Sequence, residues 1–171
     1  MALVYLGLGS NLDDRVGYIQ QAVCLLGGAN NVKIVSTSSF YETEPWHIKT
    51  EHWFVNAVIA ISTSLYPYQL LNLCNSIESK LGRSRESESG YCDRTIDVDI
   101  LFYDDRIIND CENGKNLTIP HPKIHERAFM LVPMLEIAPC YVHPVFKKTI
   151  SDLYDEIDDP ETVCLYGTRI V

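Results

Sequence analysis

The segment CDRTIDVDILFYDD, residues 92–105, decides the fold, because it has the composition of a buried strand and yet carries two acids one residue apart. Side chains in a strand alternate between its two faces, and alternate residues lie roughly 6.6 Å apart along the chain. Asp97 and Asp99 are therefore expected on the same face. That face continues into Leu101 and Tyr103, and the opposite face carries Ile96, Val98 and Ile100. We interpret a face that is polar at one end and packed at the other as the mouth of a cleft.

The acidic pair itself has two interpretations. In the plain one, it belongs to an exposed edge strand whose charges are solvated, since exposed charged residues are common. In the functional one, the two carboxylates hold a hard cation such as Mg²⁺, which binds through one or two carboxylates plus substrate phosphates. The D-x-D pattern alone does not separate them, because glycosyltransferases and many strand surfaces show it.

Composition bounds the class of protein. The chain has 171 residues, of which 46% are hydrophobic and 22% charged, as expected for one soluble globular domain spanning residues 1–171. A formal charge of -9 argues against a nucleic-acid partner, which relies on positive surface. Six cysteines without a C-x-x-C pair indicate reduced thiols, and no basic leader or long apolar stretch is present. We therefore expect no membrane partner and a cytoplasmic location.

Working outward from the acidic strand, the order of elements predicts an α+β, ferredoxin-like fold. The expected elements are a strand at 4–8, a helix capped by Asp13 or Asp14 and ending at Gly27–Gly28, strands at 33–41 and 53–63, a helix from Pro67 to Leu81 followed by Gly82, and the strand at 96–103. This β-α-β-β-α-β order describes an antiparallel sheet with its helices on one face. Beyond it we expect a hairpin near residues 106–117, a helix from about His125 broken at Pro133, and a mixed C-terminal segment.

The polar segment GRSRESESGYCDR, residues 82–94, is the first loop of interest. It carries Arg83, Arg85 and Arg94, and arginine donates paired hydrogen bonds to phosphate oxygens. Nearby acids balance these charges, so individual guanidinium placement must matter if phosphates bind. We interpret the segment as a mobile lid, and the alternative is a solvated loop with incidental charges.

Three further patterns are chemically informative. His121 lies between two prolines in TIPHPKIHER, residues 118–127, a rigid setting for an imidazole, although such a residue is often a plain loop histidine. Asn56 lies in an apolar strand run, so its amide bonds either to neighbouring backbone or to a flat heterocycle near Phe129. The GLGS segment lacks the residues of a dinucleotide fingerprint and of a P-loop, and neither is assigned.

Taken together, the motifs resemble those of the 6-hydroxymethyl-7,8-dihydropterin pyrophosphokinase family. The matching segments are YLGLGSN, SSFYETEPW, FVNAV, IESKLGRSR, DRTIDVDILFYD and LTIPHPKIHERAFMLVPMLEIAP, in the family's order and spacing over residues 4–139. The resemblance implies transfer of diphosphate from ATP to the hydroxymethyl group of the pterin with release of AMP, in folate biosynthesis. It also implies two Mg²⁺ ions bound with ATP, and the two small molecules as partners.

The resemblance further implies roles for individual residues. Asp97 and Asp99 match the metal-binding aspartates, and Arg83 and Arg94 match arginines linked to catalysis. The nucleotide-pocket positions are matched by Glu78, Arg85, Ile100, Thr118, His121 and Arg127. The pterin-pocket positions are matched by Thr43, Trp46, Phe54, Asn56 and Phe129.

The chain departs from the family's common pattern at a few positions. Tyr91 lies near the place of a ring-stacking tryptophan, Glu44 replaces a proline, Asn75 replaces a glutamine of some members, and Lys115 or Asn116 stands where some carry arginine. These changes bear on affinity and not on the reaction. The alternative functions are a noncatalytic ferredoxin-like binding module and a metal-dependent phosphohydrolase.

Overall fold

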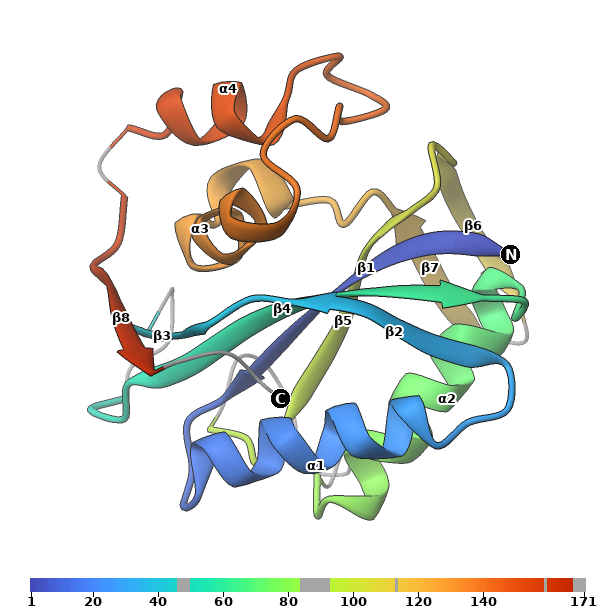
Figure 1. Cartoon of the computed structure of the whole chain (residues 1–171), viewed down its shortest axis with the longest axis horizontal. Coiled ribbons are helices and arrows are strands. Elements are labelled where there is room, and N and C mark those ends of the chain that lie inside the picture. The colour runs from blue at the N-terminus through green and yellow to red at the C-terminus, as the bar shows by residue number, and fades with distance from the viewer. Residues whose placement is uncertain (46–49, 84–92, 113, 159, 168–171) are drawn as a thin grey trace.

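The computed structural model describes residues 1–45, 50–83, 93–112, 114–158 and 160–167 (Figure 1). Its elements in chain order are β1 (Ala2–Ser10), α1 (Arg15–Gly27), β2 (Val32–Thr37), β3 (Phe40–Thr43), β4 (Phe54–Thr63), α2 (Pro67–Lys80), β5 (Asp97–Tyr103), β6 (Ile108–Glu112), β7 (Lys115–Ile119), the 3-10 turn η1 (Ile124–Glu126), α3 (Ala128–Ile137), α4 (Ile150–Asp155) and β8 (Val163–Gly167). The predicted β-α-β-β-α-β core is confirmed.

The main sheet is antiparallel at every pairing, in the order β5-β1-β4-β3-β8, with β2 also paired to β4. The single strand expected at 33–41 is wrong, because the chain breaks there into β2 and β3, which both pair with β4. The break lies at Ser38 and Ser39. The Ser38 backbone N–H donates to the Val58 carbonyl, and the Ser38 hydroxyl accepts the Val58 N–H. The Ser39 N–H donates to the Glu136 carboxylate on α3. Polar side chains here replace part of the ladder.

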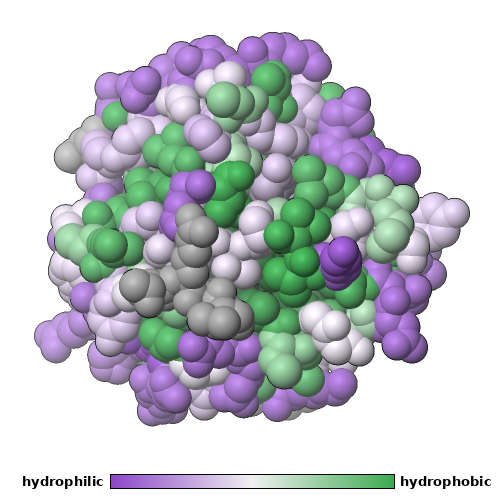
Figure 2. Space-filling view, viewed as in Figure 1, coloured by the Kyte–Doolittle hydropathy of each residue, from purple (hydrophilic) through white to green (hydrophobic). Residues whose placement is uncertain are grey.

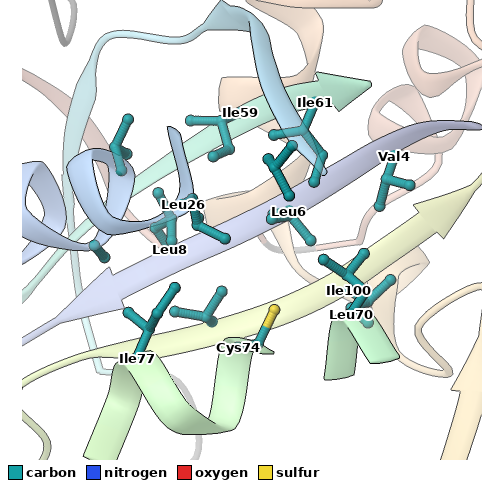
Figure 3. Packing of buried hydrophobic residues seen from close by; sticks show 14 of the residues in the cluster. Val4, Leu6, Leu8, Leu26, Ile59, Ile61, Leu70, Cys74, Ile77 and Ile100 are labelled. Carbon is teal, nitrogen blue, oxygen red and sulfur yellow. The ribbon is translucent and has the colours of Figure 1, made fainter. Parts of the chain in front are cut away.

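The two core helices cover one face of the sheet, as expected, and α3 and α4 cover the other (Figure 1). Asp14 caps α1 by accepting the Gly17 N–H at 2.9 Å, and Pro67 begins α2 at a position where no backbone donor is needed. Apolar residues from α1, α2, β1, β4 and β5 interlock between the helices and the sheet (Figure 3). Figure 2 shows apolar side chains across the middle of the same view, between more polar surfaces above and below.

Strand β5 lies at the edge of the sheet and contains a bulge. Its register against β1 shifts by one residue, so that Leu6 faces Ile100 but Tyr5 faces Phe102. The extra residue reverses the alternation beyond Leu101. Leu101 packs with α3, on the side of the sheet that carries the two aspartates, as predicted. Tyr103 packs on the α2 side, so the prediction that it shares the face of the aspartates is wrong.

The C-terminal third differs from expectation in one respect. Helix α3 begins at Ala128 and runs through Pro133 to Ile137, so the predicted break at Pro133 is wrong. Proline removes one helical hydrogen bond, but the flanking Met130, Leu131 and Met134 are buried against the sheet, and that packing outweighs the loss. The expected hairpin is β6–β7, and the mixed segment contains α4 and β8. None of the described helices is long and apolar enough to span a membrane.

Candidate functional site

Asp97 and Asp99 lie where two cavities meet. One cavity is a narrow slot on the α3 side of the sheet, floored by Gly7 and Gly9 of β1. The other is a wider cavity of about 540 Å³ beside the free edge of β5, between α2 and the β7–η1 region. Both aspartates line both cavities, which confirms the predicted position at a cleft. A group held by these carboxylates is therefore accessible from either side.

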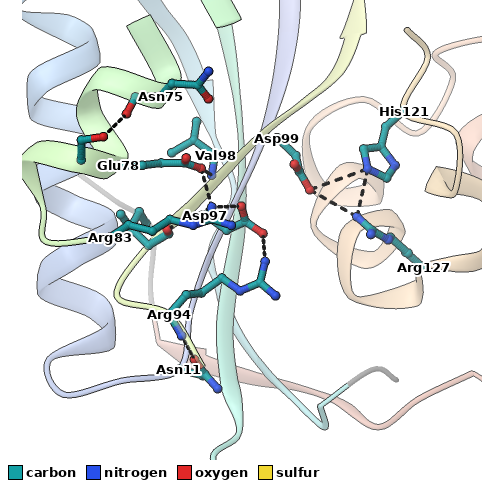
Figure 4. Close-up of polar contacts among 12 residues, drawn as sticks. Asn11, Asn75, Glu78, Arg83, Arg94, Asp97, Val98, Asp99, His121 and Arg127 are labelled. Carbon is teal, nitrogen blue, oxygen red and sulfur yellow. Dashed lines mark hydrogen bonds and ion pairs between the residues drawn. The ribbon is translucent and has the colours of Figure 1, made fainter. Parts of the chain in front are cut away.

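Asp97 is held by two arginines (Figure 4). One of its carboxylate oxygens contacts the Arg83 guanidinium, and the other accepts from Arg94 Nη1 at 2.6 Å. Burial acts to raise the pKa of Asp97, but the guanidinium groups of Arg94 and Arg83 outweigh it and hold that pKa below its usual value. Asp97 is therefore an ionised carboxylate with positive charge on both sides.

Asp99 is in a different electrostatic setting, although it is only two residues away. Its nearest cation is Arg127, whose Nη1 lies 3.3 Å from Oδ2. Burial, followed by the negative charge of Asp97, raises the pKa of Asp99 to about 7, and Arg127 offsets only part of this effect. The two neighbouring carboxylates thus differ in protonation, since Asp97 is stabilised as an anion and Asp99 is not.

His121 borders the same pair as a neutral imidazole. Burial and the charge of Arg127 lower its pKa to about 3. The approach of 3.8 Å between His121 Nε2 and Asp99 Oδ2 is therefore not an ion pair. Nδ1 lies 3.2 Å from the backbone nitrogen of Lys123, and Nε2 lies 3.3 Å from Arg127 Nη1. Both neighbours are donors, and a neutral ring accepts at only one of its nitrogens. The rigid loop thus places a neutral imidazole beside the carboxylates.

The wider cavity collects most residues predicted to bind the nucleotide. Its lining includes Glu78, Ile100, Thr118 and His121, together with the predicted catalytic residue Arg83 and the neighbours Asn75 and Asn116. Glu78 is only 2% exposed and accepts the backbone N–H of Val98 at 2.8 Å. Val98 thus directs its backbone groups to the free edge of β5, and Ile100 faces the same edge by strand alternation. Arg85 lies outside the described residues.

The narrow slot collects the residues predicted to bind the pterin. Thr43, Phe54, Asn56 and Phe129 all line it, as do Arg94 and Arg127. Arg127 was expected in the nucleotide pocket, and it lines this slot instead while reaching the carboxylate pair. Trp46 lies outside the described residues, as does Tyr91.

Asn56 is the polar centre of the slot. It is 2% exposed, and its side-chain amide donates to the Thr43 hydroxyl at 2.7 Å. A Cβ atom on Gly9 would lie only 2.7 Å from the Asn56 side-chain oxygen. Glycine at position 9 therefore lets the amide lie flat against β1, a role that the sequence analysis of GLGS missed. The two-residue alternation of glycines in a strand was the available signal, since it removes side chains from one face.

Glu161 is a second residue that sequence reasoning missed. Its carboxylate accepts the backbone N–H of Phe129 at 2.8 Å, which satisfies a donor in the first turn of α3. The carbonyl of the adjacent Thr162 accepts the Glu44 backbone N–H, the Thr162 N–H donates to the Glu44 carboxylate, and Val163 pairs with Thr43. The C-terminal segment therefore ties together two walls of the slot. No local pattern predicts this contact, because Glu161 and Phe129 are 32 residues apart in the chain.

The chemistry of the site follows from its donor set. In the described part of the chain, no group of three or more acidic, histidine or cysteine residues could hold a metal by protein ligands alone. Two carboxylates with arginines around them suit instead an ion that is shared with a phosphate-bearing substrate. Arginines near the same point suit the charge of a transferring phosphoryl group.

Comparison with known proteins gives consistent results. The family model for 7,8-dihydro-6-hydroxymethylpterin-pyrophosphokinase matches residues 5–139. The chain is 43% identical to the 2-amino-4-hydroxy-6-hydroxymethyldihydropteridine pyrophosphokinase of Methylorubrum extorquens, over 92% of this chain and 95% of that protein. It is 38% identical to the protein of the same name from Aquifex aeolicus, over 91% and 92%.

The chain is also similar to parts of larger proteins. It is 40% identical to the folic acid synthesis protein fol1 of Pneumocystis carinii, where the match spans 91% of this chain but 20% of that protein. Among solved structures, it resembles the Plasmodium falciparum HPPK-DHPS crystallised with pteroate, with a TM-score of 0.73 and 19% identity. That match covers 91% of this chain and 44% of the larger one, and it shows a shared fold.

Proposed function

The chain belongs to the 7,8-dihydro-6-hydroxymethylpterin-pyrophosphokinase family, and from that premise we propose which residues of its two cavities serve each substrate. It is a pyrophosphokinase of folate biosynthesis, whose substrates are ATP and 6-hydroxymethyl-7,8-dihydropterin. We assign ATP to the wider cavity beside β5 and the pterin to the narrow slot. The observation that carries this assignment is that Asp97 and Asp99 line both cavities, so the phosphates and the accepting hydroxymethyl group meet at the carboxylates.

The carboxylate pair fits a divalent cation. Asp97 and Asp99 offer hard oxygen ligands on one face, and a cation bound there would favour the ionised form of Asp99, which burial and the charge of Asp97 disfavour. Enzymes of this family use ATP generally with Mg²⁺, and we propose that these two residues hold two such ions. Bound there, Mg²⁺ supplies charge neutralisation and orientation for the ATP phosphates.

The arginines then have distinct tasks. In the present arrangement Arg83 and Arg94 both contact Asp97, and a guanidinium released from that carboxylate can turn toward phosphate oxygens in the same space. His121 places its neutral imidazole in the same region, and Arg127 extends from Asp99 into the slot. Glu78, Ile100 and Thr118 define the wall of the nucleotide cavity, and Arg85 is expected to join it.

The slot suits a flat heterocycle with polar edges. Phe54 and Phe129 supply aromatic surface, and Asn56 with Thr43 supplies a buried donor and acceptor set. Trp46 is expected to contribute a further ring. The single domain at 1–171 and the cytoplasmic location stay predictions. A noncatalytic module and a phosphohydrolase find no support in the relatives.

The nucleotide product tests the function. The purified chain is incubated with ATP and Mg²⁺, with and without 6-hydroxymethyl-7,8-dihydropterin, and the products are separated by chromatography. AMP formed only in the presence of the pterin is the expected result, because diphosphate transfer leaves AMP behind. ADP or free phosphate as the main product would contradict the proposal.

Asn56→Ala is expected to weaken pterin binding by roughly 1–3 kcal/mol, because it leaves buried polar groups without their partners. ATP affinity should change little, since Asn56 lines the narrow slot and does not line the wider cavity. Isothermal titration calorimetry with each ligand measures both effects. Equal losses for the two ligands would identify Asn56 as a structural amide.

Gly9→Ala is expected to weaken pterin binding at least about tenfold, because the new methyl group would displace the Asn56 amide from its position against β1. Gly27→Ala is the matched control, since a Cβ there meets only Ile34 at an ordinary 3.5 Å. Pterin titration of both variants measures the difference. Unchanged affinity in Gly9→Ala would show that the flat placement of Asn56 is not needed.

A further inference from the structure

Asn11, at the end of the YLGLGSN segment, has no part in either substrate assignment, yet its side chain is buried at 3% exposure. Its amide oxygen accepts the backbone N–H of Arg94 at 2.7 Å, and its amide nitrogen donates to the Asp93 carboxylate at 2.7 Å. The Asn11 backbone N–H donates to the Arg94 carbonyl at 3.2 Å. A weaker contact of 3.5 Å joins the amide nitrogen to the His52 carbonyl.

These contacts bind both backbone groups of Arg94 from one residue (Figure 4). The orientation of the amide is determined by its partners, because an N–H faces one end and a carboxylate faces the other. Arg94 precedes β5 by three residues, where sheet pairing no longer holds the chain. Asn11 therefore supplies to the Arg94 backbone the hydrogen bonds that a neighbouring strand would supply inside the sheet.

The direction of the Arg94 side chain depends on this anchor. Its guanidinium reaches the Asp97 carboxylate at 2.6 Å and lies 5.9 Å from the centre of the Phe54 ring, between the metal ligand and the pterin slot. A guanidinium that acts on a transferring group must be placed within a fraction of an ångström, and a shift of its backbone moves it directly. We propose that Asn11 is a positioning residue for diphosphate transfer, which anchors the Arg94 backbone while its donor bond to Asp93 fixes the orientation of the Asn11 amide. This inference rests on the proposed role of Arg94.

A swapped pair tests the anchor. Asn11→Asp keeps the acceptor for the Arg94 N–H but sets a carboxylate 2.7 Å from the Asp93 carboxylate. The double variant Asn11→Asp/Asp93→Asn restores a donor–acceptor pair with its direction reversed. Asp93→Asn alone gives the baseline for changing the contact of 3.2 Å between His52 Nδ1 and the Asp93 side chain. The rate is measured in single turnover with both substrates saturating, alongside the affinities for ATP and pterin and the melting temperature.

The expected result is a rate in Asn11→Asp at least about tenfold below wild type, with the affinities changed less than about threefold. The double variant should recover to within about threefold of Asp93→Asn. Such rescue would not follow from a residue that only stabilises the fold. A normal rate in Asn11→Asp, or a double variant as slow as Asn11→Asp, would overturn the proposal.

Combining Asn11→Asp with Arg94→Ala distinguishes failure of this inference from failure of the proposed role of Arg94. If Asn11 acts through Arg94, adding Asn11→Asp to Arg94→Ala should lower the rate by less than about threefold further. A full additional loss would overturn the positioning role while leaving the catalytic role of Arg94 intact. An Arg94→Ala variant with wild-type rate would instead remove the proposed role of Arg94 itself.

Discussion

Asp97→Ala and Asp99→Ala are each expected to lower diphosphate transfer by at least about a thousandfold, because each removes metal ligands and with them the main charge stabilisation at the phosphates. Both residues line both cavities, so neither loss can be compensated from the other side. AMP formation at saturating ATP, pterin and Mg²⁺ measures the effect. The exposed Asp155 of α4 provides the matched control, Asp155→Ala, with wild-type rate expected.

Changes at the two positions should differ in their effect on stability, and measuring the melting temperature separates loss of activity from loss of fold. Asp97→Ala leaves the Arg83 and Arg94 guanidinium groups without a shared carboxylate, a change that costs up to about 3–5 kcal/mol for a buried pair and less here because Asp97 is partly exposed. The folded protein disfavours the ionised form of Asp99, since burial and the charge of Asp97 raise the pKa of Asp99 to about 7. Asp99→Asn should therefore keep its melting temperature at pH 8 or raise it.

The sign of this stability effect follows from the raised pKa of Asp99. A carboxyl whose folded pKa lies above its unfolded value loses stability as pH rises through that interval, so the wild type should become less stable relative to Asp99→Asn between about pH 4 and pH 7. Circular dichroism melting curves across that range measure the difference. An inactive but folded Asp99→Asn variant supports the metal assignment, and a fully active one at ordinary Mg²⁺ would refute it.

Arg94→Ala is expected to lower the single-turnover rate more than about tenfold while ATP affinity changes much less, because binding energy realised only in the transition state raises the rate and not the ground-state affinity. Arg94 contacts Asp97 and lies beside Phe54, so its guanidinium is close to both the carboxylate pair and the narrow slot. Rapid-quench measurements with both substrates saturating give the rate. The exposed Arg106, which lines neither cavity, is the control as Arg106→Ala.

Arg83→Ala should also slow the chemical step, and it should cost stability at two carboxylates, whereas Arg94→Ala affects one of them. Arg83 pairs with Glu78 at 2.7 Å as well as with Asp97, and Glu78 is buried. Removing Arg83 therefore leaves a buried carboxylate with less positive charge nearby. If the Arg94 variant bound ATP far more weakly yet transferred diphosphate at the normal rate once saturated, Arg94 would be a nucleotide anchor and not a catalytic residue.

The predictions from sequence were most accurate where the physical cause is local. Asp14, Pro67 and Gly82 act through the turns in which they lie, so the ends of α1 and α2 could be predicted from capping chemistry. The shared face of Asp97 and Asp99 follows from strand alternation over three residues. The motif resemblance also identified residues of both cavities, and the described ones do line the two cavities at the carboxylates.

The predictions were less accurate where contacts with distant segments determine the local structure. Whether Pro133 breaks a helix depends on how much of that helix is buried, and the sheet that buries it comes from the first half of the chain. The position of Tyr103 depends on one extra residue in the pairing of β5 with β1, and a bulge leaves no mark in the local pattern. Arg127 lines the narrow slot because it directly precedes α3, which lies on the face of the sheet opposite α1 and α2 (Figure 1).

By itself, then, the sequence determined the helix ends, the core order of elements, the shared face of the two aspartates and the identity of the reaction, because these depend on neighbouring residues or on motifs of the family. Only the tertiary structure decided which side chains converge. Asn11 meets Arg94 across 83 residues, and Glu161 meets Phe129 across 32. Such contacts depend on strand register and on the packing of whole elements, which place residues together regardless of their separation in the chain.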